Sequence, residues 1–198
     1  MKKIVVATRN KGKIREIEAV LNGLPFQVLS LDEFPPVPDA VEDGATFEEN
    51  AAIKALYYHK HTGYPCLADD SGLEVDALGG EPGVYSARYA GEECDDAANN
   101  AKVLEKLGDT PAEKRTGRFR CVLAFADEGK TLLTAEGSCE GIILRGPKGD
   151  GGFGYDPLFY VPDLKTTLAD IPMEEKNKIS HRGKALRNLV EKLRGLAG

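Results

Sequence analysis

The stretch KKIVVATRNKGKIREIEAVLNG, residues 2–23, decides the fold class. It opens with a short apolar run typical of a buried strand, and a turn containing Asn10 and Gly12 follows. The apolar residues after the turn recur at helical spacing, and Gly23 is a helix stop. A strand, a loop and a helix in this order indicate an α/β fold.

Further strands and helices follow along the chain. The periodicity of apolar residues and the positions of turn-forming residues predict strands at 26–31, 118–126 and 131–144, and helices at 46–61, 95–107 and 180–193. Thr46 and Glu49 form a possible capping box for the first of these helices, and Ser180 is the expected N-cap of the last. The hairpin turning at residues 127–130 breaks strict strand–helix alternation. We therefore expect a twisted mixed sheet with helices on its faces.

Composition and charge limit the classes of function. The chain has 198 residues, which fits one domain with or without a smaller lobe. Its net charge of −6 disfavours nonspecific binding to nucleic acid or to an anionic membrane. The apolar run at residues 4–7 is too short for a signal peptide, and no stretch approaches membrane-spanning length. These features predict a cytoplasmic location.

Four cysteines are spread through the chain as Cys66, Cys94, Cys121 and Cys139, without any CxxC pair. Their wide spacing and mostly apolar or helical surroundings favour buried, reduced thiols over disulfides or a zinc site.

The turn ATRNKGKI, residues 7–14, could bind phosphate. It is not a Walker P-loop, because Ala7 stands where that motif needs glycine and Ile14 where it needs serine or threonine. A turn that leads into a helix nevertheless presents unpaired N–H groups and a positive dipole end, and Lys13 adds a full charge. A capped surface helix is the alternative.

The acidic pair Asp69-Asp70 is the candidate metal and catalytic site. Adjacent residues on a strand point to opposite faces, so we expect Asp70, at a strand end, to face a cleft and Asp69 to face backbone or a helix terminus. A carboxylate beside phosphates suggests Mg²⁺. Glu42 could supply a second ligand, and Lys54 could approach a phosphate. A turn stabilised by Asx hydrogen bonds is the alternative.

The stretch GPKGDGGFGYDPLF, residues 146–159, surrounds one phenylalanine with glycines. Phe153 could offer its face to a flat ligand while the glycines let backbone approach the edge of that ligand, and Asp156 could accept from a ring N–H or order a cation. A core phenylalanine on a plain hairpin loop is the alternative. The basic stretch 174–185 places Lys176, His181 and Arg182 at a helix start and could complete a nucleotide site.

Five motifs together resemble the inosine triphosphate pyrophosphatase family: ATRNKGK, EDGATFEENAAIKA, ADDSGLEVDALGGEPGVYSARYAG, GGFGYDPLF and EKNKISHRGKA. The resemblance runs from Ala7 to Ala185 in the order of the family. It implies one domain over residues 1–198, with an elongated two-lobed α/β fold, an active-site cleft between the lobes and a homodimer. It also implies Mg²⁺-dependent hydrolysis of ITP, dITP or XTP to the monophosphate and pyrophosphate.

The resemblance also implies roles for individual residues. Asp70 matches the general base and metal ligand, Glu42 matches the second metal ligand, and Phe153 matches the residue that stacks on the purine. The matching substrate contacts are Thr8, Arg9, Asn10, Lys11, Gly12, Lys13, Ser71, Phe153, Gly154, Tyr155, Asp156, Lys176, His181 and Arg182.

Three other functions compete with this interpretation. A purine nucleotide sensor would be expected to lose the acidic metal positions, which this chain keeps at Glu42 and Asp70. An RNA-binding protein is disfavoured by the net charge of −6 and by the single well-placed aromatic residue. A Maf-like pyrophosphatase acting on other modified nucleotides is the nearest rival, and the motifs GGFGYDPLF and SHRGKA favour the purine branch over it.

Overall fold

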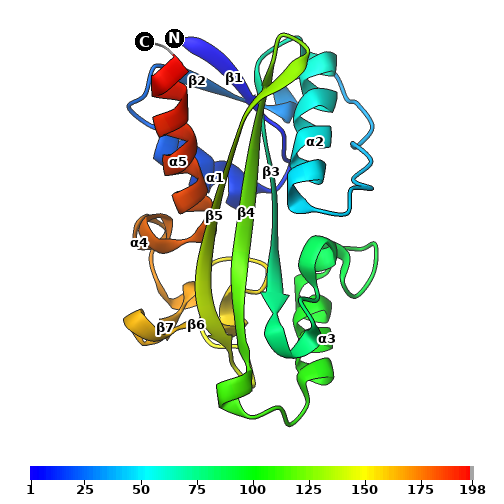
Figure 1. Cartoon of the computed structure of the whole chain (residues 1–198), viewed down its shortest axis with the longest axis vertical. Coiled ribbons are helices and arrows are strands. Elements are labelled where there is room, and N and C mark those ends of the chain that lie inside the picture. The colour runs from blue at the N-terminus through cyan, green and yellow to red at the C-terminus, as the bar shows by residue number, and fades with distance from the viewer. Residues whose placement is uncertain (197–198) are drawn as a thin grey trace. The chain divides into compact units, whose positions relative to one another are not determined.

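One mixed sheet carries the fold in the computed structural model, which describes residues 1–196 (Figure 1). Over that range the strand order is β2-β1-β3-β4-β5-β6-β7. The strands are β1 (Lys2–Val6), β2 (Phe26–Ser30), β3 (Cys66–Val75), β4 (Thr116–Asp127), β5 (Lys130–Ile143), β6 (Phe159–Val161) and β7 (Thr166–Thr167). β1 pairs in parallel with β2 and β3, whereas β6 pairs antiparallel with β5 and β7. The predicted mixed α/β class is therefore confirmed.

Three of the five described helices begin at a side-chain cap, from Asn10, Thr46 and Asp95. The helices are α1 (Lys11–Leu21), α2 (Phe47–Thr62), α3 (Asp96–Leu107), α4 (Met173–Ile179) and α5 (His181–Leu196). Thr46 caps α2 through its hydroxyl, but the carboxylate of Glu49 accepts from the N–H of Ala45, so only half of the predicted capping box forms. The predicted β4–β5 turn is confirmed, and its central residues Glu128 and Gly129 both have positive φ, as a tight hairpin requires.

The chain divides into two compact units by its internal contacts. Unit 1 comprises residues 1–70 and 121–137 and the C-terminal segment from His181, and unit 2 comprises residues 71–120 and 138–180. The strands β3, β4 and β5 contribute residues to both units.

Unit 1 packs α1 and α5 on one face of its part of the sheet, and α2 lies on the other (Figure 1). Its core joins residues of β1, β3 and β4 to the apolar faces of α1 and α5. α5 buries the side chains of Ala185, Leu186, Leu189 and Val190 in this core.

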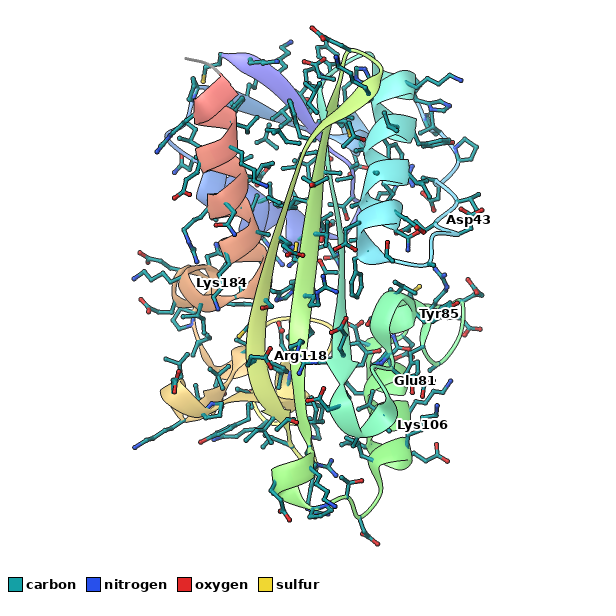
Figure 2. All side chains as sticks on the ribbon, viewed as in Figure 1. Asp43, Glu81, Tyr85, Lys106, Arg118 and Lys184 are labelled. Atoms are coloured by element: carbon teal, nitrogen blue, oxygen red, sulfur yellow. The ribbon has the colours of Figure 1, made fainter. Side chains whose placement is uncertain are left out.

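Unit 2 has a separate core in which α3 packs through Val103 and Leu107. The same core includes residues of β3, β4, β5 and β6. Lys106 of α3 pairs with Glu81 at 2.8 Å, and this ion pair ties the helix to the segment that precedes the 3-10 helix η3 (Gly83–Arg88) (Figure 2).

Two expectations about local structure are wrong. Residues 66–75 form one continuous strand, so Asp70 lies inside β3 and not at a strand end. Cys94 is exposed, whereas Cys66, Cys121 and Cys139 are buried as predicted and all four thiols are free. Burial raises the pKa of Cys66 to about 12, which keeps that thiol protonated.

None of the described helices is long and apolar enough to cross a membrane.

A substitution at Gly137 tests the packing of α5 on β5. A Cβ at Gly137 would lie 2.6 Å from the backbone nitrogen of Ala185, so Gly137→Ala must displace the start of α5. We expect a loss of about 1–3 kcal/mol in the free energy of unfolding, measured by chemical denaturation. Gly146→Ala is the control, because a Cβ there meets no atom within 4 Å. Equal stability of the two variants would contradict the prediction.

Candidate active site

The turn before α1 pairs several of its own backbone donors. The side-chain oxygen of Asn10 accepts from the N–H groups of Gly12 and Lys13, at 2.9 and 3.2 Å. Thr8 in turn accepts from the N–H of Asn10 at 3.1 Å. The expectation of unpaired N–H groups at Gly12 and Lys13 is therefore wrong, and local attraction for an anion comes from the helix dipole and from the charge of Lys13.

Two neighbours of Lys13 in this turn are exposed. Arg9 forms an ion pair with Asp39 and donates to the backbone oxygen of Val37 at 3.1 Å, so it fastens the loop that follows β2. Lys11 is exposed at the first position of α1.

Asp69 is the centre of a buried charge network in unit 1. Its carboxylate lies 3.2 Å from the Nζ atom of Lys13 and 3.3 Å from the Nη2 atom of Arg182. Arg182 also pairs with Glu16 of α1, and both of these side chains are almost fully buried. Burial alone would lower the pKa of Arg182, but Asp69 and Glu16 raise it above its usual value. Asp69 thus binds two cations.

Asp70 has a different environment, although it is the next residue on β3. It is 7% exposed, and its Oδ2 atom is buried without a hydrogen-bond partner. Burial raises the pKa of Asp70 to about 6. Lys54 and Lys13 oppose this rise, while the negative charges of Glu42 and Asp69 add to it. Asp70 is therefore a buried acid whose Oδ2 atom has no hydrogen-bond partner, and both positive and negative side chains act on it.

Glu42 and Lys54 form an ion pair of 3.0 Å in the same unit. Burial alone would lower the pKa of Lys54, but Asp69, Glu42 and Asp70 raise it. The loop that carries Glu42 is held by Asn50 of α2, whose Oδ1 atom accepts from the N–H of Gly44 at 2.8 Å. The helix therefore holds the loop two residues from Glu42.

A hard divalent cation fits this donor set. Asp70 offers a free carboxylate oxygen, and Glu42 acts electrostatically on Asp70 and on Lys54. Among the described residues, no group of three metal-ligating side chains exists. Mg²⁺ commonly takes only one or two carboxylates and completes its shell with water and phosphate oxygens, so two acids are enough.

The predicted basic cluster at 174–185 belongs to two helices. His181 and Arg182 begin α5 and lie in unit 1, both buried. Lys176 lies in α4 of unit 2, a helix that the sequence patterns did not reveal. The expectation that these three residues share one helix start is therefore wrong.

The glycine loop in unit 2 packs against its own chain. A Cβ at Gly151 would lie 2.7 Å from the backbone oxygen of Ala169, and the N–H of Gly151 donates to that oxygen at 3.0 Å. Gly152 has a φ of +70°, and a Cβ there would collide with the side chain of Asp156. Gly154 has a φ of +60° and open space on its Cβ side. Close packing within the chain explains Gly151 and Gly152, and of these three glycines only Gly154 leaves room for another group.

Phe153, Asp156 and Lys176 form one cluster in this unit. The Oδ2 atom of Asp156 accepts from the N–H of Phe153 at 3.0 Å and from the Nζ atom of Lys176 at 2.7 Å. That Nζ atom lies 4.4 Å from the centre of the Phe153 ring, which is cation–π distance. Asp156 therefore holds the ammonium group of Lys176 beside the Phe153 ring, and its contact with a ligand stays a prediction.

Tyr155 is a core residue of the same loop. Its hydroxyl donates to the backbone oxygen of Ser86 at 2.6 Å, and burial raises its pKa above the usual value. Ser86 in turn accepts from the N–H of Leu73 on β3. Ser71, two residues before Leu73, lies half-buried directly after Asp70.

The family model for the Ham1 family matches residues 4–192. The chain belongs to the Ham1 family. A dITP/XTP pyrophosphatase of Desulforamulus reducens is 58% identical over 98% of this chain and 96% of its own length. One of Geobacter sulfurreducens is 56% identical over 98% of this chain and 97% of its own. The solved structure of a HAM1 protein from Coxiella burnetii has a TM-score of 0.88 at 45% identity, covering 98% of this chain and all of that one.

These findings confirm the resemblance found in the sequence motifs, and they confirm the Ham1 fold. Sequence reasoning missed several residues that hold the site together, notably Glu16, Asn50 and Ser86. Glu16 could have been suspected, because it is an acid beside the apolar face of α1. No local signal distinguishes Asn50 or Ser86 from ordinary polar residues.

The pKa of Asp70 predicts a pH dependence of stability in the metal-free protein. The folded state keeps a proton on Asp70 up to about pH 6, whereas the unfolded state releases it near 3.8. The stability contributed by the protonated form is therefore lost as pH rises from about 4 through 6, by about 3 kcal/mol in all. Asp70→Asn should lack this loss.

Urea denaturation in EDTA between pH 4 and pH 8 checks the prediction. The relevant quantity is the difference in the free energy of unfolding between Asp70→Asn and the unaltered protein. A difference that does not change with pH would contradict the buried state of Asp70.

Proposed function

We propose that this Ham1-family protein hydrolyses non-canonical purine nucleoside triphosphates (ITP, dITP and XTP) to the monophosphate and pyrophosphate, with Mg²⁺ as cofactor. The observation that carries the proposal is the buried carboxyl of Asp70, which has an unused oxygen and lies in the field of Glu42, Lys13 and Lys54. The two relatives named above carry the name dITP/XTP pyrophosphatase, which supports the purine branch over the Maf-like alternative.

Unit 1 would hold the triphosphate. Asp70 and Glu42 are the residues that would bind Mg²⁺. Bound Mg²⁺ supplies positive charge against the phosphates and the leaving pyrophosphate. Lys13 and Lys54 add to that charge. Because Lys13 is also paired with Asp69, its ammonium group is held in place before a nucleotide arrives.

Asp70 would act on the attacking water. Its free carboxylate oxygen can order a water and accept its proton as the oxygen of that water bonds to the α-phosphorus. The bond from that phosphorus to the oxygen bridging the α- and β-phosphates breaks, and pyrophosphate leaves. A pKa of about 6 leaves Asp70 ionised at neutral pH and still basic enough to take a proton.

Unit 2 would hold the base. Phe153 offers a ring for stacking, and Lys176 is a donor fixed beside it by Asp156. Hypoxanthine and xanthine present a carbonyl oxygen at the 6-position, where adenine presents an amino group. A buried donor aimed there would lose its partner with ATP, at a cost of about 1–3 kcal/mol.

The proposal includes the organisation of the molecule. We propose that residues 1–198 act as one catalytic domain. A homodimer and a cytoplasmic location belong to the same proposal.

A nucleotide panel tests the function. Release of pyrophosphate and of orthophosphate is measured with ITP, XTP, GTP, ATP and dTTP, first with Mg²⁺ and then with EDTA. We expect pyrophosphate from ITP and XTP, lost in EDTA. Binding of ITP without cleavage would indicate a sensor, and preferential cleavage of dTTP would indicate a Maf-like enzyme.

Two isosteric substitutions separate the roles of the acids. Asp70→Asn should lower kcat by at least about 100-fold while leaving binding of ITP detectable by calorimetry, because it removes the proton acceptor and a metal ligand. Glu42→Gln should instead raise the Mg²⁺ concentration needed for half-maximal rate. Full activity of Asp70→Asn would remove Asp70 from the mechanism.

A further inference from the structure

Helix α3 holds both backbone polar groups of Gly154, the residue after Phe153. The Oδ2 atom of Asp96 accepts from the N–H of Gly154 at 2.9 Å. The Nδ2 atom of Asn100 donates to the carbonyl oxygen of Gly154 at 3.0 Å. Asp96 and Asn100 are four residues apart, so they lie on one face of the helix. Together they clamp a single residue of the loop.

The loop needs external support at this point. Gly152 and Gly154 both have left-handed φ values, which glycine adopts readily but holds weakly. Asp156 accepts a hydrogen bond from the N–H of Phe153. Asp96 and Asn100 hold Gly154, the residue that follows. The orientation of the ring therefore depends on both sets of hydrogen bonds.

The amide of Asn100 is poorly explained by stability alone. Its Oδ1 atom is buried without a hydrogen-bond partner, and a buried unsatisfied acceptor costs about 1–3 kcal/mol. Its neighbour Asn99 uses both ends of its amide, at the N–H of Ala90 and the oxygen of Ala87. The hydrogen bond that the Asn100 amide does make goes to Gly154.

The helix that carries the clamp is firmly held. Asp95 caps its start, Val103 and Leu107 anchor it in the core of unit 2, and Lys106 pairs with Glu81 (Figure 2). Groups mounted on a packed helix position a ligand more precisely than groups on a loop. Helix α3, which is rigid, thus sets the geometry of the flexible glycine loop at Gly154.

We propose that Asp96 and Asn100 are positioning residues, which hold Gly154 so that Phe153 and Asp156 are preorganised for the purine base. The inference rests on the proposed function, because it requires the loop to bind the base. The clamp contacts the loop through the backbone only, so it acts on base binding and leaves binding of the phosphates unchanged.

The test compares two ligands on the full chain. Affinities for inosine monophosphate and for pyrophosphate are measured by calorimetry with Mg²⁺, together with KM and kcat for ITP. Asn100→Ala and Asp96→Ala should each weaken binding of the monophosphate and raise KM by about 2- to 10-fold, the effect of one hydrogen bond. Affinity for pyrophosphate and kcat at saturating ITP should stay within about twofold. Asp96→Asn keeps an acceptor for Gly154 and should restore most of the affinity.

The matched control is Asn188→Ala. Asn188 of α5 also donates its amide to a backbone oxygen, that of Glu136 at 2.8 Å, but it lies in unit 1. It should lose thermal stability without any change in binding of the monophosphate. If the clamp variants bind the monophosphate as tightly as this control does, the inference is overturned. Equal weakening for monophosphate and pyrophosphate would also overturn it, because that pattern indicates general unfolding.

Phe153→Ala separates the inference from the proposed function. It should weaken binding of the monophosphate at least as much as either clamp variant does. Weakening by Phe153→Ala without weakening by the clamp variants refutes the clamp alone. If Phe153→Ala binds the monophosphate normally, the role of the loop in base binding fails, and the clamp inference fails with it.

Discussion

The carboxylate of Asp69 pairs with two cations in unit 1, the half-buried Lys13 and the buried Arg182. Breaking a buried ion pair leaves an uncompensated charge, which is strongly destabilising. Glu16 also pairs with Arg182. Through Lys13 and Arg182, the carboxylate of Asp69 connects the first turns of α1 and α5 to the middle of β3. The position of Lys13 therefore depends on this pairing as much as on the cap of its helix.

Asp70 follows Asp69 on the same strand, and the pleat of the strand separates the two carboxylates. Adjacent strand residues point to opposite faces, so two chemically identical groups enter different surroundings. Asp69 is paired, whereas Asp70 keeps an unsatisfied oxygen and a raised pKa. A fold selected for stability alone would pair or remove that oxygen. A buried acid with an unpaired oxygen and a raised pKa is typical of functional sites.

The sequence could predict features that local chemistry determines, and it missed those that depend on contacts distant in the chain. Apolar periodicity and caps were sufficient for α3 and α5, and two residues of positive φ form the β4–β5 turn where it was expected. The cap of Asn10 stayed one of two alternatives, because a capped helix start and a phosphate-binding turn have the same sequence. The short helix around Lys176 was missed because its residues are mostly polar. That Arg182 meets Glu16 across 166 positions could not be read from either segment alone.

A buried carboxylate also organises unit 2, where the backbone is harder to hold in one conformation. Asp156, like Asp69, is a buried carboxylate that binds a lysine, and it also accepts from the N–H of Phe153. Asp69 lies on a strand, where the ladder already fixes the main chain, whereas Asp156 ends a loop of left-handed glycines. A carboxylate can fix only the groups that it touches, so the rest of the loop needs donors and acceptors from a rigid neighbour. Helix α3 supplies them at Gly154, so a rigid helix fixes the main chain of the glycine loop directly after Phe153.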